Sequence, residues 1–329
     1  MKIKTKELKV FNSAASGMKQ NGILPILSYL KLDNGTITKN NHESFITMEI
    51  DFEDSCLIDE RTLMDFVESV NADEIDVEVK GTTVVLSHGK ERVISPTDDV
   101  ANFPALSEPD GAEEIVLLPE ILKAIKIASN FTMDRENLPF TSCVFVGNGL
   151  VGATSGFIAY TEKIQEDLPK IILEKPMVSA LKGLEFVTLS QNETYIFLST
   201  GSFRYGFIKK DTKFIDMERF AAFPEGEAIT MPKDDFIRFC DFCTSRCMGK
   251  LVVIASIKED KLSMIDADYG IDYEKPLPVT LPDFSFNPSM MGKLLKSLPD
   301  DKLKFLKTDK KMYITGENGG YVSLIMEMV

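Results

Sequence analysis

The spacing of apolar residues along the chain alternates between a helical and a strand-like period. Apolar residues three and four positions apart form one stripe from Leu118 to Ala128 and another from Met290 to Leu298. Proline fits the first helical position, where an N–H group has no partner, and Asn287 before one such proline is an N-cap candidate. The prolines assigned to helix starts are Pro119, Pro176, Pro232 and Pro288. The predicted helices cover residues 5–19, 59–71, 119–130, 175–186, 232–246 and 288–298.

Three of these helices precede pairs of strand-like segments. Each pair consists of two short runs rich in β-branched and aromatic residues with a polar turn between them, which is the pattern of an antiparallel hairpin. The pairs are 75–79 with 83–87, 186–190 with 195–199, and 303–306 with 312–315. Helices alternating with hairpins in this way predict an α+β fold in which helices pack on antiparallel sheets.

An internal repeat organises these elements. A shift of 114 residues superimposes segment 24–35 on segment 138–149 with five identities in twelve positions: a Leu-Pro pair, a serine and an Asn-Gly pair. Asn-Gly between two β-rich runs is the sequence form of a tight hairpin. Segments 250–257 and 261–265 form a weaker third copy without Leu-Pro or Asn-Gly. The chain therefore reads as one α+β unit written three times.

Domain boundaries follow from this repeat and from two linkers. The linkers, at 102–113 and 223–227, are rich in proline, glycine and acidic residues. We expect three domains, at 1–112, 113–224 and 225–329. A chain of 329 residues is too long for one ordinary core, which agrees with this division.

Composition narrows the class of protein further. The hydrophobic share of 44% is that of a globular protein, and no stretch approaches 18 uninterrupted apolar residues. The basic start of the chain leads into a mixed segment instead of an apolar signal core. Five unevenly spaced cysteines indicate reduced thiols. We therefore expect a cytoplasmic protein with no membrane partner.

The net charge of −14 argues at first against binding to nucleic acid, because phosphates attract Lys and Arg. The six predicted helices sum to +3, however, so the rest of the chain carries −17. Their cations lie opposite the apolar stripes. Two interpretations stay open: a mildly basic face that holds DNA on an acidic body, and ordinary solvated helix faces. Helix 59–71, with a net charge of −3, counts against the first.

Groups suited to catalysis are scarce. His42 and His88 are the only histidines, and both fall in turn-like segments. The sequence contains no glycine-rich phosphate loop after a strand. Asp266 and Asp268 could suggest a cation site, but two carboxylates are commonplace in an acidic chain. We therefore expect a non-catalytic protein.

One cysteine cluster has two interpretations. Cys240, Cys243 and Cys247 could bind zinc or an iron–sulfur cluster, but no fourth ligand is nearby. The same positions, with Phe236 and Phe239, also form an apolar helical face, and a buried free cysteine packs as a small hydrophobe. We favour core packing and expect neither a metal nor any other cofactor.

Six segments, taken in order, resemble the bacterial sliding clamp family, the β subunit of DNA polymerase III. No single motif is specific, but their order and spacing together cover essentially the whole chain. The segments are Leu24-Pro25-Ile26-Leu27, Asn102-Phe103-Pro104-Ala105-Leu106, Ala153-Thr154-Ser155-Gly156-Phe157-Ile158-Ala159, Lys213-Phe214-Ile215-Asp216-Met217-Glu218-Arg219-Phe220, Phe286-Asn287 and Met326-Glu327-Met328-Val329. The family's counterparts read Leu-Pro-Ile-Leu, Phe-Pro-x-Leu, Ala-Thr-Asp-Gly-His-Arg-Leu, Arg-Phe-Pro-Asp-Tyr-Arg-Arg-Val, Phe-Asn and Met-Pro-Met.

The resemblance implies three clamp-type domains per chain and a closed homodimeric ring around duplex DNA. Contacts to DNA would be weak and independent of sequence. A trimeric ring is disfavoured, because three repeats per chain already give six units as a dimer. The cations that would face DNA are Lys19, Lys123, Lys126, Lys182, Arg238, Arg246, Lys293 and Lys296. The dimer interface would include Phe103, Leu106 and Phe242.

The resemblance also implies a groove between the second and third domains that binds short peptides of partner proteins. The implied partners are the DNA polymerase catalytic subunit, the clamp loader and other proteins with clamp-binding motifs. The groove residues would be Phe140, Thr154, Gly156, Phe157, Ile158, Ala159, Ile215, Arg219, Phe220, Cys247, Leu324, Ile325, Met326 and Met328. Flexible methionine and aromatic side chains suit an adaptable peptide site.

The chain departs from the family pattern within this groove. Phe157 and Ile158 replace the usual His-Arg, Ile215 replaces a proline and Glu327 replaces the last proline. These changes leave open which peptides the site prefers. The main alternative is a repeat-built scaffold that binds proteins without encircling DNA.

Overall fold

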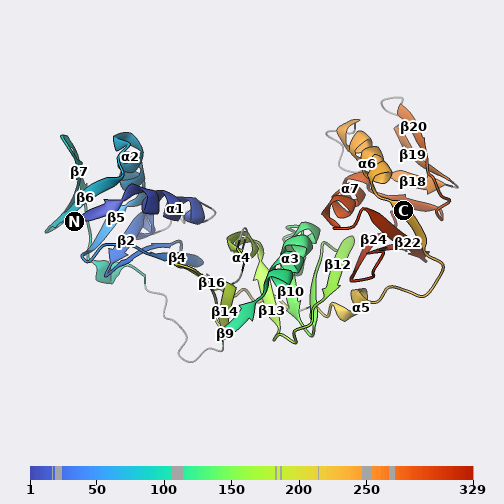
Figure 1. Cartoon of the computed structure of the whole chain (residues 1–329), viewed down its shortest axis with the longest axis horizontal. Coiled ribbons are helices and arrows are strands. Elements are labelled where there is room, and N and C mark those ends of the chain that lie inside the picture. Colours follow the sequence, from blue (N-terminus) through green and yellow to red (C-terminus); the bar gives the residue numbers. More distant parts are fainter. Residues whose placement is uncertain are drawn as a thin grey trace. The chain divides into compact units, whose positions relative to one another are not determined.

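The structure is a computed structural model of the chain (Figure 1). It describes residues 1–16, 18, 24–104, 114–181, 184–185, 187–213, 215–246, 254–258, 260–266 and 271–328. The chain forms two compact units. Unit 1 contains Met1–Leu118 and Ser179–Asp211, and unit 2 contains Pro119–Val178 and Thr212–Val329.

Unit 1 contains two antiparallel sheets. Its strands are β1 (Lys2–Lys4), β2 (Tyr29–Asp33), β3 (Thr36–Asn40), β4 (Ser44–Glu49), β5 (Ser55–Asp59), β6 (Glu74–Lys80), β7 (Thr83–His88), β8 (Glu91–Pro96), β9 (Glu114–Leu117), β14 (Val187–Gln191), β15 (Tyr195–Thr200) and β16 (Phe203–Ile208). A four-stranded sheet has the order β1-β6-β7-β8, and an eight-stranded sheet has the order β5-β2-β3-β4-β16-β15-β14-β9.

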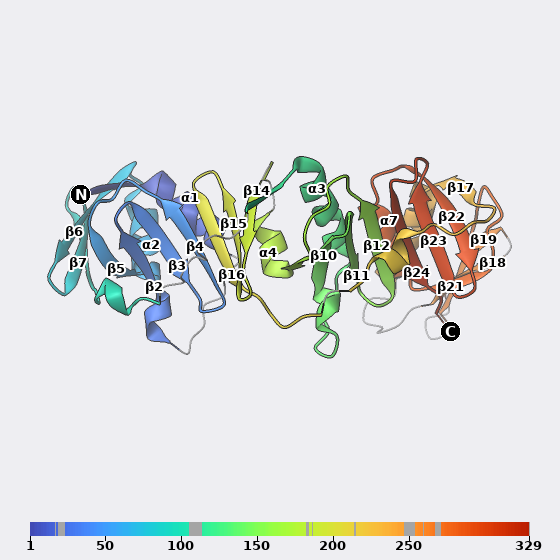
Figure 2. The same ribbon diagram turned by 90° about the horizontal axis from the view of Figure 1, so that it is seen from below.

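Unit 2 repeats this plan. Its strands are β10 (Cys143–Gly147), β11 (Leu150–Thr154), β12 (Ile158–Lys163), β13 (Ile171–Glu174), β17 (Ile229–Pro232), β18 (Ala255–Lys258), β19 (Lys261–Asp266), β20 (Ile271–Pro276), β21 (Phe284–Phe286), β22 (Lys302–Thr308), β23 (Lys311–Gly316) and β24 (Tyr321–Met326). The eight-stranded sheet has the order β13-β10-β11-β12-β24-β23-β22-β17, and the four-stranded sheet the order β20-β19-β18-β21. Figure 2 shows β12 and β24 side by side within unit 2.

Helices cover the sheets through their apolar faces. The α-helices are α1 (Thr5–Ala15), α2 (Glu60–Val70), α3 (Pro119–Ala128), α4 (Lys175–Ala180), α5 (Glu218–Ala221), α6 (Asp234–Arg246) and α7 (Pro288–Ser297). The short 3₁₀ helices are η1 (Pro25–Ser28), η2 (Val100–Asn102), η3 (Ser129–Phe131) and η4 (Pro139–Ser142). Helix α1 packs on α2, and α6 packs on α7. Helix α3 packs on β10, β11 and β12 (Figure 1). The α+β prediction is confirmed. Helices pack on the sheets, and all strand pairs between described residues are antiparallel.

The two Asn-Gly hairpins are confirmed. Asn34 and Gly35 have φ angles of 46° and 85° between β2 and β3, and Asn148 and Gly149 have φ angles of 54° and 68° between β10 and β11. Two successive residues with positive φ form the turn whose twist matches a two-residue hairpin. The two copies of the Asn-Gly sequence therefore adopt the same backbone conformation.

Some predicted helix limits are wrong. Pro232 does not start a helix: it ends β17, the outermost strand of its sheet, where a missing N–H is tolerated, and α6 begins at Asp234. Helices α1 and α4 end at Ala15 and Ala180, earlier than predicted. The four-residue helix α5 is absent from the prediction.

Within the described residues, the strands fall into three sets of eight, β1–β8, β9–β16 and β17–β24. Strand β4 of the first set pairs with β16 of the second, and β12 of the second set pairs with β24 of the third. These two pairings occupy equivalent positions, eight strands apart. The equivalent third pair would consist of β20 and β8, which instead form ends of the two four-stranded sheets.

Candidate functional site

The pairing of β12 with β24 brings most of the predicted groove residues together. Ile158 lies opposite Ile325 and Ala159 opposite Leu324. The Met326 amide extends this ladder by donating to the Phe157 carbonyl over 2.9 Å. We call this part of unit 2 the junction sheet. It joins segments that are more than 150 residues apart in the chain.

Alternation along the strands divides the junction sheet into two faces. Tyr160 stacks on Phe131 of η3 at 5.0 Å, so Ile158, Tyr160 and Ile325 lie on the face covered by α3 and η3. Burial, together with a hydrogen bond to Glu162, raises the pKa of the Tyr160 hydroxyl. This α3 face is interior packing.

The opposite face carries Ala159, Thr161, Leu324 and Met326 and is covered by α5, so we call it the α5 face. The Thr161 hydroxyl donates to the Phe220 carbonyl at the end of α5 over 3.1 Å. Met217, just before α5, is 3% exposed. Further along, Phe223 contacts Tyr313 edge-on at 6.5 Å. The segment 217–223 is therefore attached to the junction sheet at several points.

A small apolar cluster lies beneath this segment. Its buried members are Cys143, Phe145, Leu150 and Met217. Three predicted groove residues pack against it while remaining partly exposed: Phe140, Ile215 and Phe220. Residues from β10, η4 and the segment before α5 thus contribute to one apolar surface. Partly exposed aromatic side chains of this kind suit contact with an apolar ligand.

The β11–β12 turn borders the same surface. The Thr154 hydroxyl donates to the Ile158 carbonyl and accepts from the Gly156 amide, each over 3.0 Å. Gly156 has φ +87°, a conformation that side chains disfavour. This turn presents Phe157 with 40% of its surface exposed. The Arg135 guanidinium lies over the Phe157 ring, 4.3 Å from its centroid.

Hydrogen bonds attach the segment that follows β24 to its neighbours. The Glu327 amide donates to the Lys310 carbonyl over 2.8 Å, and the Met328 amide donates to the Ser285 carbonyl over 2.9 Å. The Glu327 carboxylate lies 3.7 Å from the Lys307 ammonium, and both side chains are about a quarter exposed. Glu327 thus makes an ion pair that the family's proline cannot make. Met326 and Met328 remain partly exposed.

The predicted groove residues therefore divide into three groups. Those at the α5 face or its border are Phe140, Thr154, Gly156, Phe157, Ala159, Ile215, Arg219, Phe220, Leu324, Met326 and Met328. Ile158 and Ile325 point to the α3 face. Cys247 lies outside the described residues. The sequence analysis did not select Arg135, Met217 and Tyr313 as groove residues: no motif includes Arg135 or Tyr313, and Met217, although it lies in a quoted motif, is identified only by its packing against Cys143, Phe145 and Leu150.

Six of the eight predicted DNA-facing cations lie on helices of unit 2. Lys123 and Lys126 are exposed on α3, Lys293 and Lys296 on α7, and Arg238 and Arg246 on α6. Lys19 and Lys182 lie outside the described residues.

Two of these cations have electrostatic neighbours. Lys296 pairs with Asp241 at 2.5 Å. Burial and the neighbouring charge of Lys175 lower the pKa of Lys293. Lys175, which the prediction omits, is exposed and pairs with Asp134 at 3.0 Å. The charges of Lys175 and Lys293 therefore interact, although the two lysines belong to α4 and α7.

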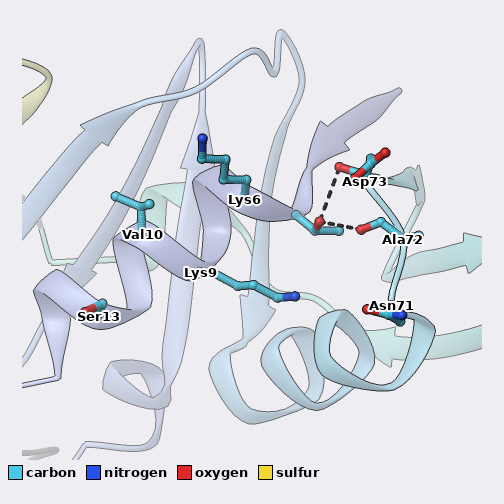
Figure 3. Close-up of a pocket in the computed structure, with 8 residues that line it drawn as sticks. Lys6, Lys9, Val10, Ser13, Asn71, Ala72 and Asp73 are labelled. Carbon is cyan, nitrogen blue, oxygen red and sulfur yellow. Dashed lines mark hydrogen bonds between the residues drawn. The ribbon is translucent and has the colours of Figure 1, made fainter.

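Unit 1 adds a shallow depression of about 420 Å³ between α1 and the end of α2 (Figure 3). Lys6, Lys9 and Ser13 of α1 line it opposite Asn71 and Asp73. Figure 3 shows the Lys9 side chain extending toward Asn71 and Lys6 pointing away from it. The depression lacks an enclosed set of polar groups, so we interpret Lys6 and Lys9 as solvated cations of the helix face.

The predicted dimer-interface residues lie in different surroundings. Phe103 is 5% exposed within unit 1, and Leu106 lies outside the described residues. Phe242 packs on Tyr273 of β20 with 4.2 Å between ring centroids. On β8, Ile94 is 57% exposed, although the sequence analysis did not select it. Both terminal strands, β8 and β20, thus carry or border large apolar side chains.

Metal chemistry finds no support in the described part of the chain. No group of three or more His, Cys, Asp or Glu side chains there is arranged to hold an ion. Cys240 and Cys243 are both buried in α6. Burial raises the pKa of the Cys240 thiol. None of the described helices has the length and apolarity to span a membrane.

The repeated strand sets, and the eight-stranded sheets that join one set to the next with helices packed on them, define a DNA clamp fold. Known proteins support this assignment by structure alone. No protein-family model matches the sequence, and no curated protein matches it either.

Solved structures of bacterial DNA polymerase β subunits share the fold over the whole chain. The sliding clamp of Bacillus subtilis superimposes with a TM-score of 0.86 at 17% identity, covering 100% of this chain and 98% of that one. The β subunit of Streptococcus pyogenes gives 0.84 at 15% identity, covering 99% of both chains. The DNA polymerase III β subunit of Pseudomonas aeruginosa gives 0.83 at 18% identity, covering 100% and 99%. The chain therefore has the fold of the DNA polymerase III β subunit.

Proposed function

We propose that the chain is a sliding clamp, a non-catalytic processivity factor that encircles duplex DNA and tethers a polymerase and other partners to it. The observation that carries this proposal is the likeness to DNA polymerase sliding clamps, which covers 99–100% of this chain and 98–99% of theirs. A likeness to a single repeat would fit many roles, whereas the full set of three repeats is what a two-chain ring of six units needs.

The order in which the strands pair supports closure of that ring. Two of the three equivalent junctions form within the chain, between β4 and β16 and between β12 and β24. The third needs β8 and β20, which end their respective sheets. We propose that β8 of one protomer pairs antiparallel with β20 of its partner. The exposed Ile94 and the Phe242–Tyr273 contact would then be buried at the joint.

The helices would line the hole and contact phosphates. The exposed cations of α3, α6 and α7, together with Lys175, support this assignment. An acidic body would repel DNA from the outer surface. Loose, sequence-independent contacts let a ring slide while its topology prevents escape.

The α5 face of the junction sheet would bind peptides of the polymerase catalytic subunit, the clamp loader and other partners. Its partly exposed methionine, phenylalanine and isoleucine side chains support this role. Such side chains adapt their shape to different apolar anchors.

A loading experiment tests the proposed function. The purified chain is incubated with a clamp loader and ATP on nicked circular DNA, and the DNA is then passed through a sizing column. A clamp stays with the circle and is released when a restriction enzyme linearises it. A strict monomer in solution, or equal retention on linear DNA, would contradict encirclement and favour a scaffold that binds proteins only.

A further inference from the structure

The cation–π pair at the edge of the α5 face bears on which peptides that face accepts. The Arg135 guanidinium lies 4.3 Å from the centroid of the Phe157 ring. A second observation fixes its place: a side chain added at Gly156 would meet Arg135 Nη1 at 3.6 Å. Arg135 therefore lies over the whole Gly156–Phe157 turn and not only over the ring edge.

Stacking leaves the hydrogen-bonding edge of the guanidinium available. The ring occupies one face of the planar group, whereas the N–H donors point outward in the plane. None of the ion pairs between described residues involves Arg135. This is notable in a chain with 51 acidic and 37 basic residues, and the adjacent Asp134 instead pairs with Lys175. The neighbouring acid Glu136 is exposed.

The position of this pair connects it to the peptide surface. Phe157 is bonded through its carbonyl to the Met326 amide, so the pair lies at the Met326 end of the α5 face. Across from Met326, β23 contributes Lys311, whose Cα is registered with that of Met326. A peptide that places an apolar side chain beside Met326 thus passes between two cations. A carboxylate at that point would accept hydrogen bonds from the N–H groups of the Arg135 guanidinium, whose position is already fixed by the Phe157 ring.

We propose that Arg135, held by Phe157, selects partner peptides that carry a carboxylate next to their apolar anchor. This inference rests on the proposed peptide-binding role of the α5 face and adds the chemistry of its preferred ligand. The carboxylate is that of a Glu or Asp side chain or of the peptide's own C-terminus. Both have the same planar shape and accept two parallel N–H bonds from one guanidinium.

The test uses fluorescence anisotropy with labelled peptides of about ten residues, rich in leucine and phenylalanine, on the full-length protein. Each peptide is made in four forms, with a glutamate or a glutamine beside the anchor and with a free or an amidated C-terminus. We expect a form with a carboxylate to bind about tenfold more tightly. A hydrogen bond to a charged group is stronger than one to a neutral group by a free energy that corresponds to about that factor in affinity. The amidated glutamate form and the free-acid glutamine form separate the two sources.

Three variants separate this mechanism from general electrostatics. Arg135→Met should abolish the preference for the carboxylate, so that the four peptide forms bind with equal affinity. Arg135→Lys should restore only part of the preference and make it more sensitive to salt, since an ammonium lacks the planar fork. Phe157→Leu should weaken the preference by releasing the guanidinium. Arg61→Met removes the same charge from α2 in unit 1, where 89% of the Arg61 side chain is exposed, and should change nothing.

The outcomes discriminate between the two proposals. Equal binding of all four peptide forms, or a preference that survives Arg135→Met, would overturn the role of Arg135 while leaving a peptide site in place. Failure of every peptide to bind would overturn the peptide-binding function and this inference together. Folding of each variant is checked by its thermal unfolding midpoint, and Arg135→Lys provides a conservative variant if Arg135→Met is destabilised.

Discussion

Two glycines lie where sheet packing leaves no room for a side chain. At Gly206 on β16, an added Cβ would lie 1.9 Å from Cε1 of Phe45 on β4. At Gly152 on β11, it would lie 2.7 Å from Cε of Met217 and 2.9 Å from the Tyr160 carbonyl oxygen. All three distances are shorter than any ordinary contact. Each glycine thus lets a large side chain from a distant segment lie directly on the backbone, one at the β4–β16 junction and one beneath α5.

Replacing Gly206 with alanine should destabilise unit 1. Phe45 is 7% exposed and contacts Phe197 edge-on at 6.0 Å, so its ring has little space to move. Overpacking of this kind costs about 1–3 kcal/mol, and we expect the upper end of that range. Denaturant unfolding measures the loss. Gly320→Ala, where an added Cβ meets nothing within 4 Å, is the matched control.

A double-mutant cycle sharpens this prediction. If the Phe45 ring causes the loss, Phe45→Leu should cost less in the Gly206→Ala background than in the wild type, because the smaller side chain leaves room for the added methyl group. Additive losses would show that the clash is relieved elsewhere.

Replacing Gly152 with alanine should act mainly on peptide binding. Met217 is flexible and can move away, whereas the Tyr160 carbonyl cannot, so the segment carrying α5 should shift off the junction sheet. We expect about tenfold weaker binding of partner peptides with about 1 kcal/mol of lost stability. Isothermal titration with a loader-derived peptide measures the first quantity and thermal unfolding the second. Unchanged affinity would mean that the position of α5 does not control the site.

At the scale of elements, local sequence patterns correctly predicted turns and helix caps, because these depend on interactions between residues close in the chain. The Asn-Gly turns adopt their expected positive φ angles, and the side chain of Asn287 caps α7 by accepting from the Met290 amide over 3.0 Å. Pro232 was misread because a proline fits both a helix start and the end of an edge strand. Pairing of β12 with β24 could not be predicted from either strand, since the two segments lie more than 150 residues apart and no turn joins them. The Arg135–Phe157 contact depends on that pairing and was missed with it.

Strand β8 offers an exposed apolar side chain with which the proposed dimer joint can be tested. Ile94→Glu places a charge on the proposed joint with β20, where Ile94 is 57% exposed. Burial of an isoleucine contributes about 1.5–3 kcal/mol, so the dimer dissociation constant should rise by at least about tenfold. Sedimentation across a concentration series measures it. Val116→Glu makes the same change on β9, at a position 52% exposed, and should leave the dimer intact. Equal effects of both variants would argue against the β8 joint.

At the scale of the whole molecule, charge is distributed unevenly between helices and sheets. The chain carries −14, yet the exposed cations of α3 and α7 lie on the side of those helices away from their buried faces. One of them, Lys296, is already paired with Asp241, so its contribution to phosphate binding should be reduced. The expected affinity for DNA is therefore modest, which suits the proposed sliding on DNA.

Replacing Lys123, Lys126, Lys293 and Lys296 with alanine should flatten the salt dependence of DNA binding. Each phosphate contact contributes a slope of about 0.9 in log affinity against log salt, so the slope should fall by about two to three. Electrophoretic shifts at several salt concentrations measure it. The control replaces four exposed lysines on strands and turns, Lys80, Lys90, Lys163 and Lys302. Equal losses in both variants would indicate a general charge effect and not a DNA-facing surface.

The long-range sheets also determine the order in which the chain can fold during synthesis. Strand β4 ends at Glu49, but its neighbour β16 begins only at Phe203, about 150 residues later. At roughly 5–20 residues per second, β4 leaves the ribosome on the order of ten to thirty seconds before its partner exists. Strand β12 waits as long for β24 at the end of the chain. The nascent protein thus presents unpaired sheet edges for most of its translation, and we expect its yield to depend on chaperones that cover such edges.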